Sequence, residues 1–109
     1  MANTFKLKTK ANVGVTTVGI YTAPASTTTV VIGITLANTS GSGLNVGVGI
    51  TRAGTTEDVK LLKNAPIPQG SSLEFMGGNK VVLETTDTLT VDSDTNNSVD
   101  AALTIMEIT

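Results

Sequence analysis

The most regular feature of the chain is a pair of alternating apolar rows between Thr28 and Arg52. The first row is Val30, Ile32, Ile34 and Leu36, and the second is Leu44, Val46, Val48 and Ile50. Every second residue is aliphatic in both rows, which is the spacing of a strand that buries one face. The Ser- and Gly-rich segment 38–43 separates them and favours a chain reversal. The pattern therefore predicts a β-hairpin over 28–52 with both rows buried.

The other face of the second strand carries almost no side-chain volume. Its members are Asn45, Gly47, Gly49 and Thr51. Glycine within a strand often marks a place where another backbone approaches closely. We expect another sheet, or a neighbouring subunit, to lie near this face.

The N-terminal segment 1–11 predicts a basic arm or strand. Phe5 and Leu7 alternate with Lys6, Lys8 and Lys10, so one face is apolar and the other is cationic. A row of lysines is typical of an edge strand, where it discourages unwanted pairing. The alternative is an arm that lies on an acidic neighbour.

Further strands are expected along the rest of the chain. They cover residues 16–23, 59–64, 72–76, 81–83, 88–92 and 99–108. Pro66 and Pro68 should end the strand at 59–64, and Gly77-Gly78-Asn79 predicts a tight hairpin turn. A single helical turn over 56–64 is the alternative for that segment. The fold class is therefore all-β: a single antiparallel β-sandwich, jelly-roll-like or Ig-like, of about eight strands.

Composition agrees with one β domain spanning 1–109. Of the 109 residues, 39 are Val, Ile or Thr, the β-branched types that favour strands. A chain of this length suffices for one core. No apolar run approaches the roughly 20 residues that a membrane-spanning helix needs, and the N-terminus lacks the pattern of a signal peptide. We expect neither a membrane partner nor export by a cleaved signal.

Charge is unevenly distributed, although the formal net charge is only −2. The first 56 residues contain four basic residues and no acid, whereas the remainder contains three lysines and all nine acids. One interpretation is that the two halves pair within the chain. The other is head-to-tail complementarity between copies, since opposite potentials on separate faces steer subunits together.

The residue types needed for most enzyme chemistry are missing. The sequence has no histidine, cysteine or tryptophan, only three aromatic side chains and a pI near 4.8. Histidine is the commonest general base and metal ligand, and basic or aromatic surfaces carry nucleic-acid binding. We therefore predict no enzyme, no catalytic residue, no cofactor, no nucleic-acid partner and no small-molecule substrate.

Two acidic patterns were weighed as sites. The run from Asp92 to Asn96 resembles the start of a calcium-binding loop, but Asn97 replaces the glycine and Leu103 replaces the bidentate glutamate of that motif. Whether this loop binds an ion is left open, and no metal ligand is assigned. Glu84 and Asp87 form a candidate carboxylate pair, but we expect these turn-flanking acids to be solvated.

Several stretches resemble small virion structural proteins of tailed bacteriophages. They are 20–25, 28–36, 67–73, 82–91 and 99–109, and they include the sequences Ile-Pro-Gln-Gly-Ser-Ser-Leu and Val-Leu-Glu-Thr-Thr-Asp-Thr-Leu-Thr-Val. The resemblance lies in the sequences of the expected strands and turns, across most of the chain. It implies a non-enzymatic β-sandwich made in the host cytoplasm and incorporated into the virion.

The expected function is therefore that of a virion structural protein. In its most specific form this is a capsid decoration or cement protein that packs on the major shell protein and stabilises the particle. The alternatives are a neck, tail or fibre-associated structural module, or a β module that binds a receptor or glycan. The expected partners are copies of the chain itself, as a homo-oligomer, and a larger capsid or tail protein.

Overall fold

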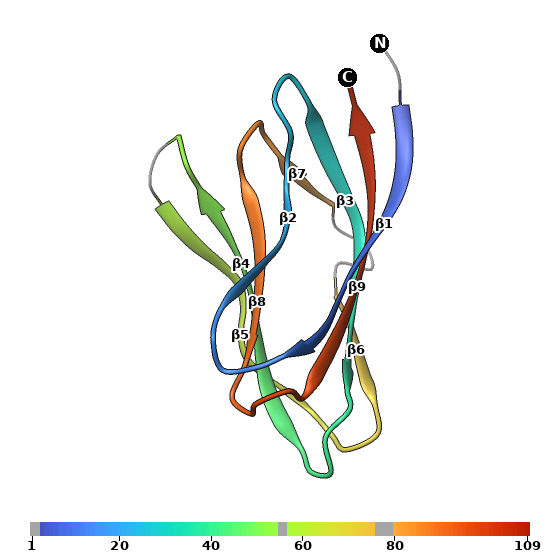
Figure 1. Cartoon of the computed structure of the whole chain (residues 1–109), viewed down its shortest axis with the longest axis vertical. Helices are drawn as coiled ribbons and strands as arrows, with labels where there is room; N and C mark the ends of the chain where they lie inside the picture. The colour runs from blue at the N-terminus through green and yellow to red at the C-terminus, as the bar shows by residue number, and fades with distance from the viewer. Residues whose placement is uncertain (1–2, 55–56, 76–79) are drawn as a thin grey trace.

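The structure, a computed structural model, consists of two antiparallel β-sheets packed face to face (Figure 1). It describes residues 3–54, 57–75 and 80–109. The strands are β1 (Asn3–Val13), β2 (Val18–Thr22), β3 (Thr28–Asn38), β4 (Leu44–Arg52), β5 (Glu57–Ile67), β6 (Ser72–Phe75), β7 (Val81–Leu83), β8 (Thr88–Ser93) and β9 (Val99–Ile108). The predicted all-β sandwich is confirmed.

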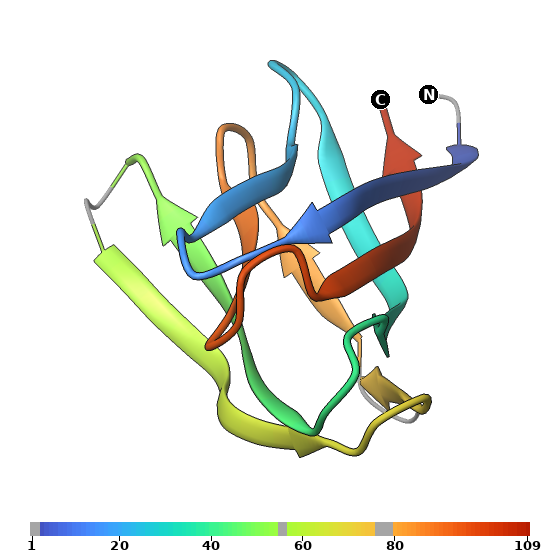
Figure 2. The same cartoon turned by 60° about the horizontal axis from the view of Figure 1, so that its bottom comes forward.

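The strands pair in a nested order. Sheet A is ordered β1-β9-β3 with β6 and β7 along its far edge, and sheet B is ordered β2-β8-β4-β5. The first strand thus pairs with the last, the second with the second last, and so on inward to the β4–β5 pair. Most connections cross from one sheet to the other (Figure 2). This is a jelly roll, in which nine strands occupy eight positions.

The predicted hairpin over 28–52 is wrong, because β3 lies in sheet A and β4 in sheet B. The connecting loop is held by Asn38, which is buried at the end of β3. Its amide nitrogen donates to the carbonyl oxygens of Ser42 at 2.8 Å and Ile67 at 3.0 Å, and its amide oxygen accepts from the Ser40 backbone N–H at 2.9 Å. These bonds hold the chain in a crossover between layers, and each strand then pairs on both sides within its own sheet.

The face prediction for β3 is right at Ile34 and Leu36 and wrong before them. The pairing with β9 shifts between Val31 and Gly33, so Ile32 is an extra residue, as in a β-bulge. Val31 is consequently buried, whereas Val30 and Ile32 are only partly covered. On β9 the alternation is unbroken, and the predicted inner row is confirmed. Its members are Val99, Ala101, Leu103 and Ile105.

Residues 57–67 form a long strand, so the helical-turn alternative for 56–64 is wrong over the described part of that segment. The strand also continues through Pro66, where the sequence predicted an end. This is possible because β5 is an edge strand whose one pairing partner in the sheet order is β4. A proline there costs no ladder hydrogen bond when its missing N–H would face away from the sheet.

The predicted turn at Gly77-Gly78-Asn79 lies outside the described residues, but the hairpin built on it is wrong. Both β6 and β7 run antiparallel to β3, β6 along 34–37 and β7 along 29–31. They therefore follow the same direction and form one interrupted edge. β6 and β7 are thus each paired with β3 and not with each other as a hairpin.

The close approach predicted for the glycine face of β4 is present, and neighbouring strands of the same sheet make it. A Cβ added to Gly49 would lie 2.8 Å from the carbonyl oxygen of Val59, and one added to Gly47 would lie 2.5 Å from a carboxylate oxygen of Asp92. Both β5 and β8 thus lean over this face, and side chains larger than hydrogen do not fit without movement.

This packing predicts opposite outcomes for two strand glycines. Gly49→Ala should lower the free energy of unfolding by about 1–3 kcal/mol, because the new methyl meets a backbone carbonyl that cannot rotate away. Gly33→Ala has nothing within 4 Å of the added Cβ and should leave stability unchanged or raise it by about 0.4–1 kcal/mol. Chemical denaturation of both variants checks this, and equal losses would contradict the close approach at Gly49.

Candidate functional site: a polar cluster between the sheets and an apolar outer face

A polar cluster on the inner face is centred on the hydroxyl of Tyr21. This hydroxyl projects from β2 in sheet B and donates to Oε2 of Glu107 on β9 in sheet A at 2.5 Å. The Thr29 hydroxyl on β3 lies 2.8 Å from the tyrosine oxygen and forms a second hydrogen bond with it. Lys6 Nζ on β1 lies 2.8 Å from Oε1 of the same glutamate. Four strands from both sheets thus meet through one tyrosine and one carboxylate.

The two acids of this cluster have shifted pKa values. Burial, and then the hydrogen bond to Glu107, raise the pKa of Tyr21 to about 12. The hydrogen bonds from Lys6 and then from Tyr21 hold the pKa of Glu107 below its ordinary value, against the opposing effect of burial. Tyr21 is therefore a neutral donor and Glu107 an anion across the neutral range, which is a stable structural arrangement.

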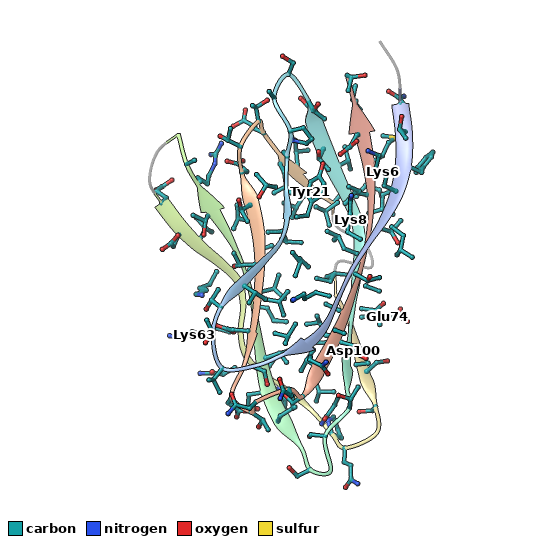
Figure 3. The ribbon with its side chains drawn as sticks, viewed as in Figure 1. Lys6, Lys8, Tyr21, Lys63, Glu74 and Asp100 are labelled. Carbon is teal, nitrogen blue, oxygen red and sulfur yellow. The ribbon has the colours of Figure 1, made fainter. Side chains whose placement is uncertain are left out.

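By register the lysines of β1 lie on the inner side of sheet A, although they stay exposed or only partly covered at this edge. Lys6, Lys8 and Lys10 pair in register with Ile105, Leu103 and Ala101, the inner row of β9. Figure 3 shows Lys6 and Lys8 in the same part of the molecule as Tyr21. The prediction that β1 is an edge strand is confirmed, but its apolar residues face solvent while Lys6 is used in an ion pair.

Sequence reasoning missed this cluster, although a signal was available. Glu107 continues the inner alternation of β9 two residues beyond Ile105, so parity places a carboxylate on a buried face. A buried charge requires a partner. Tyr21 is the one tyrosine of the chain, and it was not connected with that requirement.

A second charged group lies where β4, β7 and β8 come together. Arg52 forms ion pairs with Glu84 and, at 3.3 Å through Nε, with Asp87. Asp87 also accepts the backbone N–H of Glu84 at 3.0 Å, and it is only 4% exposed. The hydrogen bonds with Asp87 and then Glu84 raise the pKa of Arg52.

The structure thus brings the predicted carboxylate pair together, but the expectation that both acids are solvated is wrong for Asp87. Arginine binds both carboxylates through charge-assisted hydrogen bonds, which occupy them within the fold. A hollow of about 340 Å³ adjoins this group. Its chemistry is that of an ion-paired turn.

In all three of these ion pairs the cation comes from the first half of the chain and the acid from the second. Pairing within the chain, the first interpretation of the uneven charge, therefore accounts for Lys6 and Arg52. Head-to-tail complementarity between copies stays a prediction.

The loop from Asp92 to Asn96 uses its oxygens within the protein. Asp92 accepts from the Thr17 hydroxyl at 3.0 Å, and Asp94 accepts from the Asn45 backbone N–H at 3.2 Å. Ser93 bonds the buried Ser98 hydroxyl at 2.9 Å. Within residues 3–54, 57–75 and 80–109, no three acidic, histidine or cysteine side chains are grouped to hold a metal ion.

The outer face of sheet A is the most unusual surface of the molecule. One row of in-register side chains crosses all four strand positions, and every member is apolar. From β1 to β7 they are Phe5, Met106, Val30 and Val82. Phe5 is 69% exposed and Val82 is 55% exposed, and Leu7 beside them is 65% exposed. We call Phe5, Leu7, Met106, Val30 and Val82 the apolar ridge.

A shallow hollow lies on the same outer face, beyond the apolar ridge. It has a volume of about 310 Å³, and small side chains form much of its floor. Thr9, Thr35, Ala37 and Ala102 are among its lining residues. The outer face of sheet B differs, because threonines occupy a row across it. Thr22 and Thr51 flank Thr88 there in register.

Comparisons with known proteins support the fold. No protein-family model and no curated protein matches the chain. A solved structure described as Bacillus endospore appendages, a family of disulfide-linked pili, contains a chain with the same fold. The two superpose with a TM-score of 0.56 at 17% identity, over 99% of this chain and 87% of the other. In the described residues no helix is long and apolar enough to cross a membrane.

The shifted pKa of Tyr21 gives a direct optical test, since the chain has one tyrosine and no tryptophan. Tyrosinate absorbance in the folded protein should titrate near pH 12, and in denaturant near the ordinary value of about 10. A folded pKa above the unfolded one means that this contribution to stability is full below pH 10 and is lost between pH 10 and 12. Glu107→Gln should move the folded titration toward 10, and an unchanged midpoint in that variant would contradict the role of the carboxylate.

Lys6 and Lys10 should differ, although both lie on the cationic face of β1. Lys6→Gln leaves the buried Glu107 without its cation and should destabilise the fold by about 1–2 kcal/mol, a figure reduced because Lys6 is 43% exposed. It should also raise the pH at which acid unfolding begins, because the folded pKa of Glu107 rises toward its unfolded value. Lys10→Gln is the matched control and should stay within about 0.5 kcal/mol of wild type. Thermal denaturation at neutral and acid pH measures both, and equal effects would refute the pairing.

Proposed function

We propose that this chain is a non-enzymatic structural subunit that acts by packing against copies of itself within a larger particle or filament. The observation that carries the proposal is the apolar ridge on the outer face of sheet A. Exposed apolar side chains scattered singly need no explanation, but a contiguous in-register row marks an interaction surface. The fold itself is complete without this row, because the core lies between the sheets.

The polar groups support the same proposal. The buried acids Glu107 and Asp87 are each bound to a cation and to a further donor. An acid or base for catalysis needs a pKa near the working pH and a substrate within reach. In the Tyr21 cluster the hydrogen bonds instead raise the pKa of Tyr21 and lower the pKa of Glu107, which stabilises their ordinary charge states at neutral pH.

In its most specific form, the proposal is a decoration or cement protein on the capsid of a tailed bacteriophage, with the major shell protein as second partner. The strand and turn sequences that resemble small virion proteins support a decoration or cement role. A neck, tail or fibre position is the alternative within the same class.

A subunit of a surface appendage is a second candidate, and the similarity of fold to the Bacillus endospore appendage chain favours it. That structure is described as disulfide-linked, whereas this chain contains no cysteine. An appendage built from this chain would therefore need non-covalent contacts, for which the apolar ridge is available.

Localisation tests the proposal. Virus particles and surface appendages should be purified from the source by density gradient, and the chain quantified in each fraction by mass spectrometry. We expect the chain to follow one assembly at a fixed ratio to its major protein, and antibodies to the chain to label that assembly in electron micrographs. A chain found only in the soluble fraction, alongside a cytoplasmic marker, would refute a structural role.

A further inference from the structure

We propose that the outer face of sheet A binds the same face of a second copy, with the apolar ridge of each subunit seated in the hollow of the other. The inference rests on the proposed function, since it names the partner of the face that carries it. It starts from the relative positions of the two features on β9.

The apolar ridge and the hollow are placed symmetrically about Thr104. Met106 belongs to the ridge and Ala102 to the hollow, and each lies two residues from Thr104 on the central strand β9. On β1 the same relation holds for Phe5 and Thr9, which lie two residues to either side of Leu7. Leu7 and Thr104 are themselves paired in register.

This arrangement is what a two-fold dimer requires. In a C2 interface the same patch serves both subunits, so that if one residue contacts a second, the second contacts the first. A two-fold axis that lies between the faces and crosses the strands at Thr104 places β9 antiparallel over β9. Met106 of each copy then faces Ala102 of the other, and Phe5 faces Thr9.

The side-chain sizes fit this superposition. Phe5, Met106 and Val30 of the apolar ridge would face Thr9, Ala102 and Thr35, which are small. At the axis Leu7 would face Leu7 of the other copy, and at the edge Val82 would face Glu74. Sheets that pack face to face interdigitate at about 10 Å. Parallel superposition would instead place ridge on ridge and hollow on hollow, which leaves a gap. The antiparallel arrangement fills the hollow of about 310 Å³ from both sides.

The area of the face also bears on a second copy. By register the acids Glu74 and Asp100 lie on this outer face, Glu74 on the edge strand β6 and Asp100 in the lining of the hollow, so the interface would include both. Four strands about 4.8 Å apart and ten residues long give a flat area of about 600 Å². This area lies at the boundary between weak, transient interfaces, which bury less than about 600 Å² per partner, and ordinary stable ones, which bury roughly 800 Å² per partner.

The first test is the oligomeric state of the full chain. Sedimentation equilibrium at about 100 µM, above the micromolar range of weak interfaces of this size, should give a dimer. Val82→Glu buries a charge in the interface and should raise the dissociation constant at least roughly tenfold. Val15→Glu is the matched control, because Val15 is 56% exposed, close to the 55% of Val82, and lies in the β1–β2 connection. It should stay dimeric.

Cross-linking tests the geometry. The chain has no cysteine, so each introduced thiol reports on one position. Thr104→Cys lies at the proposed axis and should be joined to its own copy by a short bis-maleimide, whereas Thr51→Cys on the outer face of sheet B should not. Circular dichroism of each variant confirms that the fold is intact.

The outcomes separate the inference from the proposed function. The inference is refuted if the wild-type chain is a monomer, or if Val82→Glu dimerises as strongly as Val15→Glu. If the chain still follows a particle in the gradient in that case, the structural role stands and the face binds another protein. A dimer linked through Thr104→Cys in a chain absent from all assemblies supports the inference and refutes the role.

Discussion

The nested pairing of the first half of the chain with the second is the constraint on which the rest of the structure depends. The innermost pair is β4–β5 and the outermost is β1–β9, and successive pairs lie alternately in sheet B and sheet A. Antiparallel partners distant in sequence must find their register before the core closes. Such topologies are rich in non-local contacts, which makes folding slow compared with helical proteins of the same size.

This pairing explains why basic and acidic residues are separated along the sequence but lie next to each other in the folded protein. Strands from the cationic half always lie beside strands from the acidic half, so Lys6 reaches Glu107 diagonally across β1 and β9. Arg52 reaches Glu84 and Asp87 in the same way. The sequence asymmetry is a property of the fold, and it stabilises pairing between distant strands.

Alternation predicted the existence of most strands, and the whole of β9 with its inner row, because nothing interrupts its register. It failed where one extra residue changes parity, as at Ile32, since a bulge leaves no mark in a run of aliphatic residues. It also paired β3 with β4, because a Gly- and Ser-rich loop has the same composition in a hairpin and in a crossover. The deciding bonds of Asn38 reach Ile67, which is 29 residues away.

The candidate site was hidden for a related reason. On an edge strand with one apolar and one cationic row, burial of the apolar row is the simple expectation. The partner strand decides otherwise, because Glu107 on the inner face of β9 requires a cation and Lys6 supplies it. Phe5 and Leu7 consequently lie on the outer face of sheet A, although both sides of β1 stay largely exposed.

The outer faces of sheets A and B therefore differ in polarity. The outer face of sheet B is lined by threonines such as Thr22 and Thr88, whose hydroxyls hydrogen-bond to each other at 2.9 Å, and it is suited to water. The inward turn of Lys6 accounts for the orientation of Phe5, but not for the apolar residues that continue the row on β9, β3 and β7. Polar side chains at Met106, Val30 and Val82 would satisfy the same pairing and the same core. A covering molecule would account for their apolar character, and in the dimer that we propose the small side chains two rows away would receive Phe5, Met106 and Val30.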